Sequence, residues 1–131
     1  MLASERHALF NAIVASAALV LFAALIPSVG PVRAQAGFAV LGLTALGRIF
    51  YRRKEARIVT DERDQHIAMR ALQIGFAVFW VIFVEGIVAA YFIRRSSGMI
   101  SISVLPFIVW MGWAVFQLAH SAALLILYRR S

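Results

Sequence analysis

Long runs of apolar residues, separated by short polar segments, make up most of the chain. Four runs can be distinguished, at about residues 8–29, 35–51, 71–93 and 102–128. A bilayer core of about 30 Å needs about 20 helical residues, and about 17 to 25 are tolerated. None of the runs alternates apolar and polar residues as transmembrane β-strands do. The pattern predicts an all-α integral membrane bundle of four transmembrane helices, in one domain that covers residues 1–131.

The first two runs have features of their own. The second is near the lower length limit and contains three glycines, which are common in membrane helices because they let helices approach closely. The first run precedes a small-residue pattern at residues 34–36 that resembles a signal-peptide cleavage site. It is longer than a usual signal core and begins with the acidic Glu5 beside Arg6, so we interpret it as a true transmembrane span.

The composition excludes several other classes of protein. Hydrophobic residues make up 63% of the 131 residues and charged residues only 15%. A water-soluble domain of this size buries only about two-thirds of its surface, too little to hide so many apolar side chains. The chain has no cysteine, which excludes a disulfide-stapled domain, and its uncharged stretches are unlike a nucleic-acid-binding surface. The lipid bilayer is therefore an expected partner, and nucleic acid is not.

The few charges are unequally distributed, with a net charge of +7. If the N-terminus is inside, three basic residues lie outside the membrane: Arg33, Arg94 and Arg95. The other ten lie inside: Arg6, Arg48, Arg52, Arg53, Lys54, Arg57, Arg63, Arg70, Arg129 and Arg130. By the positive-inside rule, both termini and the loop at 52–70 should be cytoplasmic, in a cell (inner) membrane. The inequality also argues against a dual-topology protein, such as a fluoride channel or a small multidrug exporter.

The loop at residues 52–70 is the longest polar segment. Its first part is basic and can contact anionic headgroups at about 1 kcal/mol per charge; the residues are Arg52, Arg53, Lys54 and Arg57. Its second part begins with Thr60 or Asp61, both good helix N-caps, and acids follow in the first turn. We therefore expect one helix from about Asp61 to Ile93, which extends about three turns into the cytoplasm.

A family resemblance lies in the same segment. The sequence Thr60-Asp61-Glu62-Arg63-Asp64, followed by Ile67 and by Arg70-Ala71, resembles small prokaryotic membrane proteins of the domain-of-unknown-function type. These carry an Asp-Glu-Arg motif before their third transmembrane helix and are often encoded beside small helix-turn-helix regulators. The resemblance implies a regulatory or partner-binding role and supplies no catalytic residue, substrate or cofactor.

The charged residues of this segment allow three interpretations. The first is a capped helix start whose acids pair with arginines of the adjoining loop. The second is a docking surface for a soluble protein or a second copy of the chain, formed by Asp61, Glu62, Arg63, His66 and Arg70. The third is a metal or catalytic site. No His-Glu-x-x-His motif supports it, and we expect neither an enzyme nor a cofactor.

Glu85 lies in the middle of the third apolar run, with no other charge within eight residues. An acid near the centre of a transmembrane helix costs on the order of 3 kcal/mol, so it should face the protein interior, be paired or be protonated. The fourth run offers partners along one helix face, at spacings of three and four residues: Trp110, Trp113, Gln117 and His120. By depth, we expect Glu85 to hydrogen bond to Trp113 or Gln117.

Two interpretations of these intramembrane residues stay open. The first is a polar contact that fixes how helices or copies of the chain pack. The second is a site for proton- or cation-coupled transport at Glu85 and Gln117. Our leading expectation for the whole protein is a non-enzymatic membrane interaction or regulatory protein that forms homo-oligomers. Its basic loop and the charged start of the third helix would contact a cytoplasmic partner or the lipid headgroups. The alternative is a small oligomeric transporter or channel.

Overall fold

The computed structural model describes residues 3–47, 62–95, 98 and 101–130. In chain order it contains the α-helix α1 (Ala3–Ala34), the 3-10 helix η1 (Gln35–Gly42), and the α-helices α3 (Glu62–Arg94) and α4 (Val104–Arg130). Within this part of the chain, three stretches are long and apolar enough to cross a membrane: Glu5–Gly47, Glu62–Ile93 and Val104–Arg130. The all-α, multi-pass architecture is therefore confirmed. The expectation of four transmembrane helices is wrong.

The second apolar run does not form a long helix of its own. Residues 35–42 form η1, residues 43–47 are helical, and the last residues of the predicted run lie outside the described part. Each glycine in a helix interior costs about 1 kcal/mol relative to alanine, and the described residues of this run contain Gly37, Gly42 and Gly47. This run therefore has little intrinsic preference for a long α-helix.

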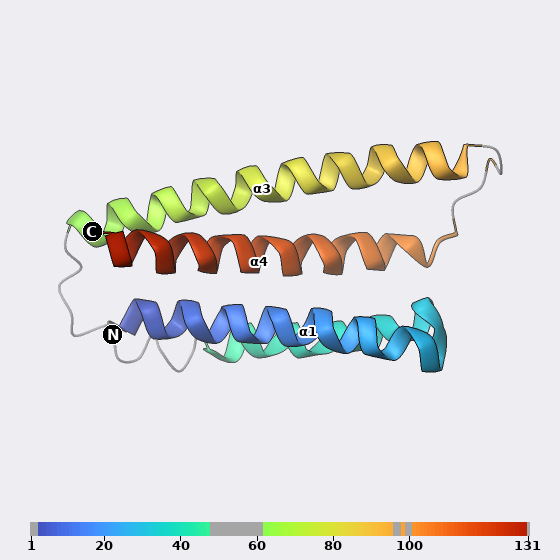
Figure 1. The fold of residues 1–131 in the computed structure, drawn as a ribbon, viewed down its shortest axis with the longest axis horizontal. Helices are drawn as coiled ribbons and strands as arrows, with labels where there is room; N and C mark the ends of the chain where they lie inside the picture. The colour runs from blue at the N-terminus through green and yellow to red at the C-terminus, as the bar shows by residue number, and fades with distance from the viewer. Residues whose placement is uncertain (1–2, 48–61, 96–97, 99–100, 131) are drawn as a thin grey trace.

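A sharp reversal connects α1 to η1. Gly30 interrupts α1 with φ 80° and ψ 164°, and Pro27 and Pro31 lie on either side of it. Figure 1 shows the chain turning back at this end of α1, so that η1 runs antiparallel beside it. The register follows from close approaches, because Gly37 lies against Leu21 and Phe22, and Gly47 lies against the ring of Phe10.

α3, α4 and α1 lie in a row, and η1 lies along α1, so the elements do not form a four-helix bundle (Figure 1). α4 lies between α1 and α3 (Figure 1), and it packs closely against both. Among the described elements, α3 packs against α4 alone. A large part of the α3 surface is consequently not covered by protein in the single chain.

The core lies where α1, η1 and α4 meet. The ring of Phe22 stacks on Phe38 at 4.9 Å between centroids, and it lies 5.4 Å from Phe107. Small side chains complete the cluster: Ala15, Ala18 and Ala114 are fully buried. At the end near the reversal, Gln35 Nε2 donates a hydrogen bond of 3.1 Å to the Ser103 carbonyl oxygen, which joins the start of η1 to the start of α4.

Two glycines lie within the contact between α3 and α4. A Cβ at Gly75 would lie 3.0 Å from the Cβ of His120, and a Cβ at Gly112 would lie 2.7 Å from the ring of Phe79. Glycine at such positions lets two membrane helices approach closely. These contacts also fix the antiparallel register of α3 and α4.

Candidate functional site

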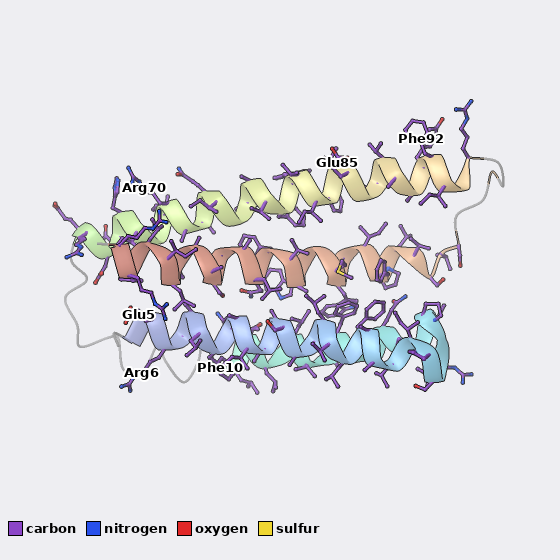
Figure 2. All side chains as sticks on the ribbon, viewed as in Figure 1. Glu5, Arg6, Phe10, Arg70, Glu85 and Phe92 are labelled. Atoms are coloured by element: carbon purple, nitrogen blue, oxygen red, sulfur yellow. The ribbon has the colours of Figure 1, made fainter. Side chains whose placement is uncertain are left out.

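Exposed charged side chains gather at one end of the molecule, where α1 and α3 begin and α4 ends (Figure 1). We call this surface the charged end. Its residues are Arg6 of α1, Glu62, Arg63, His66 and Arg70 of α3, and Arg129 and Arg130 of α4. Figure 2 shows Arg6 and Arg70 on opposite sides of this end. The charged end therefore presents groups of both signs, with arginine in excess.

The α3 part of the charged end stands on a rigid helix. Glu62 and Asp64 lie in its first turn, where carboxylates complement the partial positive charge of the helix N-terminus. Ile67 and Ala71 are buried, whereas Arg63, His66 and Arg70 are exposed around them. The apolar side of these first turns is thus fixed in place, and the charged side is open.

Several of the residues predicted to contact a partner or the headgroups lie outside the described residues: Arg52, Arg53, Lys54, Arg57 and Asp61. The structure therefore brings together only Glu62, Arg63, His66 and Arg70 of the predicted set. Sequence reasoning did not assign Arg6, Arg129 and Arg130 to this surface, although their position at predicted inner ends of helices was a usable signal.

Glu85 does not lie in the interior of the chain. Its side chain is exposed and points away from α4 (Figure 2). It therefore points away from the helix that carries Trp113 and Gln117, the two partners that we expected.

The register of α3 against α4 explains part of this difference. Gly86 and Ile87 line a hollow together with Phe107 and Ile108, so the level of Glu85 on α4 is about one turn before Trp113. The rotation of α3 about its own axis also contributes, because it turns Glu85 away from α4. Each residue turns an α-helix by about 100°, so Glu85 lies about a quarter of a turn away from Gly86, which lines that hollow beside α4.

The predicted polar face of α4 is divided among different surroundings. Gln117 is only 8% exposed, His120 contacts Gly75 and stacks on Phe116 with 5.7 Å between centroids, and Trp113 is 44% exposed. The structure therefore does not bring Glu85, Trp113, Gln117 and His120 together as one site in a single chain.

An aromatic groove lies on one side of the α3–α4 contact and was not predicted. It has a volume of about 450 Å³. Its aromatic lining residues are Phe76, Phe79, Phe83, Trp110, Trp113 and Phe116. Its walls are almost wholly apolar, which suits a hydrocarbon chain and offers few groups for chemistry.

Two buried polar atoms, one on α1 and one on α4, were also not predicted. Asn11 is 8% exposed and Ser121 is fully buried, and neither Asn11 Oδ1 nor Ser121 Oγ has a hydrogen-bond partner among the described residues. The Asn11 amide nitrogen lies 3.5 Å from Nε2 of His7. A polar residue within an apolar run indicates in the sequence that such an atom could be buried. Only the packing of the helices in the structure shows that both oxygens are buried.

No metal-binding group of three or more His, Asp or Glu side chains occurs in the part of the chain that the structure describes. His66 belongs to the exposed charged end, and His120 stacks on Phe116 inside the row of helices. The described geometry thus offers a charged surface for binding and an isolated acid at membrane depth.

Comparison with known families now identifies the chain. Residues 5–131 match the model of a family described as "Predicted membrane protein (DUF2178)", so the chain belongs to that family. This confirms the resemblance to a membrane protein family of unknown function. No curated protein and no solved structure matches the chain.

Proposed function

We propose that this member of the DUF2178 family is a non-enzymatic membrane interaction protein that binds a soluble cytoplasmic protein through its charged end. The observation that carries the proposal is the first part of α3. It exposes Glu62, Arg63, His66 and Arg70, while the neighbouring Ile67 and Ala71 are buried and hold these turns in place. Binding to a preformed helical surface costs less conformational entropy than binding to a mobile segment.

The orientation that we propose follows from the positive-inside rule. The described charged end contains Arg6, Arg63, Arg70, Arg129 and Arg130, whereas Arg33 and Arg95 belong to the opposite end. The charged end should therefore be cytoplasmic. The partner surface should carry both signs, with acidic groups opposite the arginines.

Photocross-linking in cells tests this proposal. A photoreactive residue in place of His66 is expected to give one discrete cross-linked product that contains a soluble protein. Reversal of the charges of Glu62 and Arg63 should remove that product, because like charges would then face each other across the interface. The matched control is Gln65→Ala, since Gln65 is exposed in the same turn but uncharged. Cross-linking to lipid alone, or a product that survives charge reversal, would contradict the proposal.

We also propose that the protein acts as a homo-oligomer. The arrangement of the helices supports this proposal. Among the described elements α3 packs against α4 alone, and Glu85 lies on the uncovered surface of α3, which a second copy could cover. A transport site at Glu85 and Gln117 has less support, since one residue is exposed on α3 and the other is buried on α4.

A further inference from the structure

The outer side of α3 has a regular pattern centred on Glu85. Residues at alternating spacings of four and three lie along one side of an α-helix, as in the seam of a left-handed coiled coil. Around Glu85 these positions form the α3 seam, which consists of Ile74, Val78, Val81, Glu85, Val88 and Phe92. Glu85 and Phe92 lie on the side of α3 that is turned away from α4 (Figure 2).

The α3 seam differs in composition from the other sides of the same helix. The rings of Phe76, Phe79 and Phe83 line the aromatic groove, whereas the seam from residue 74 to 88 contains only β-branched side chains besides Glu85. β-Branched side chains have few rotamers, so little conformational entropy is lost when they pack. Val81 is 63% exposed, so this surface is open in the single chain.

Glu85 makes an uncovered seam costly in lipid. A carboxyl group at membrane depth is costly unless a partner pairs with it or covers it. Its polar atoms need both a donor and an acceptor if they are to be satisfied without water. A partner that covers the seam must therefore supply a hydrogen-bonding group at the same depth as Glu85.

We propose that the α3 seam is the contact between two copies of this chain, with the two Glu85 carboxyl groups hydrogen bonded to each other. This names the interface of the homo-oligomer and rests on the self-association proposed above. In the single orientation proposed above from the positive-inside rule, two α3 helices can pair in parallel around a two-fold axis. Such an axis places identical residues opposite each other, and Glu85 then meets Glu85 at equal depth.

A carboxyl O–H can donate a hydrogen bond and a carboxyl oxygen can accept one, so two carboxyl groups at equal depth are complementary partners. Parallel helices with a left-handed seam are a common arrangement in membranes. A single polar residue in such a seam fixes the register of the two helices.

Cysteine cross-linking in native membranes tests this interface, and the chain has no natural cysteine. Val81→Cys and Val88→Cys place a thiol one turn before and one turn after Glu85 on the seam. Ile87→Cys is the matched control, because Ile87 is exposed at nearly the same depth but lies off the seam. Mild oxidation should give at least about tenfold more disulfide-linked dimer from the seam variants, since close apposition raises the effective concentration of the thiols.

Variants of Glu85 in the Val88→Cys background test the carboxyl pair. Glu85→Gln should retain cross-linking, because two amides can exchange hydrogen bonds. Glu85→Lys should reduce it about tenfold or more, because two ammonium groups repel and neither accepts a hydrogen bond. The inserted amount of each variant is measured by alkaline extraction of the membranes, so that a loss of cross-linking is compared at equal insertion.

A count of copies in lipid nanodiscs separates the two proposals. A monomeric protein would overturn both the self-association and the α3 seam. An oligomeric protein that cross-links equally at Ile87→Cys and Val88→Cys would overturn the seam alone. Retention of the dimer in Glu85→Lys at equal insertion would overturn the carboxyl pair.

Discussion

Gly75 of α3 lies directly against His120 of α4, where a Cβ on residue 75 would be 3.0 Å from the His120 Cβ and 3.2 Å from its Cα. The neighbouring atoms belong to the base of a side chain and to the backbone, so they cannot move away by a simple rotation. This contact sets both the distance and the register of the two helices. The exposed position of Glu85 depends on that register.

Gly75→Ala should therefore destabilise the protein. Overpacking a close contact typically costs about 1–3 kcal/mol, and the methyl group would push α3 away from α4. The measurement is the midpoint of thermal unfolding in mild detergent. Gly86→Ala is the control, because nothing lies within 4 Å of a Cβ at that position. Equal midpoints for the two variants would show that α3 and α4 are farther apart than the structure has them.

The long helices could be predicted from the sequence because their local and global signals agree. The acids at Glu62 and Asp64 precede an unbroken apolar run, and α3 extends through both. The conformation of the second apolar run, at residues 35–51, could not be predicted from the sequence in the same way. Its length alone suits a membrane span, but its conformation depends on contacts with α1, such as Gly37 against Phe22, and tertiary contacts override weak local preference.

The position of Glu85 shows a second limit of sequence reasoning. An acid in an apolar run indicates that some partner is needed, and this much holds without a structure. Which side of α3 carries Glu85 relative to α4 depends on Gly75 and Gly112, where the two helices meet. Glycines in membrane helices are a usable signal for such contacts, but their pairing across two helices is visible only in three dimensions.

Gly30 gives a prediction about the reversal between α1 and η1. Its φ of 80° with ψ of 164° lies in a region that is essentially restricted to glycine, and another residue there costs about 1–3 kcal/mol. Gly30→Ala should lower the unfolding midpoint even though nothing lies within 4 Å of the added Cβ. Gly42→Ala is equally unhindered and lacks a positive φ, so it should change the midpoint little. If both variants behave alike, the reversal does not require the conformation of Gly30.

Phe38 gives a prediction about the returning segment. It is fully buried and stacks on Phe22, so Phe38→Ala should leave a cavity between η1, α1 and α4. Packing contacts hold membrane helices together, and loss of a buried aromatic ring should cost about 2 kcal/mol or more. Leu43→Ala is the control on the same segment, since Leu43 is 45% exposed. The reversible unfolding of both variants in mixed detergent measures the difference, and an equal loss would contradict the packing of η1 into the core.

Ser121 and Thr44 are two hydroxyl residues whose replacement should affect the free energy of unfolding differently. Both are buried hydroxyl residues, but Thr44 Oγ1 donates a hydrogen bond of 2.7 Å to the Leu41 carbonyl oxygen, whereas Ser121 Oγ has no partner among the described residues. A buried hydroxyl without a partner costs about 1–3 kcal/mol, and a satisfied one contributes about 0.5–1.5 kcal/mol. Ser121→Ala should therefore raise the free energy of unfolding or leave it unchanged, and Thr44→Val should lower it.

Reversible unfolding in mixed detergent measures the free energy of unfolding of both variants. The loss in Thr44→Val gives the contribution of one buried hydrogen bond. Ser121→Ala is a small change that creates little empty space and leaves the helix backbone intact, so the sign of its effect reports on the hydroxyl group. A loss of stability equal to that of Thr44→Val would mean that Ser121 Oγ is hydrogen bonded in the membrane. Asn11 Oδ1 is also buried without a partner among the described residues, so the same measurement is made on Asn11→Leu and on the Ser121→Ala, Asn11→Leu double variant. If the change in unfolding free energy of the double variant equals the sum of the two single changes, the two oxygens lie in separate sites. If it differs from that sum, they share one site.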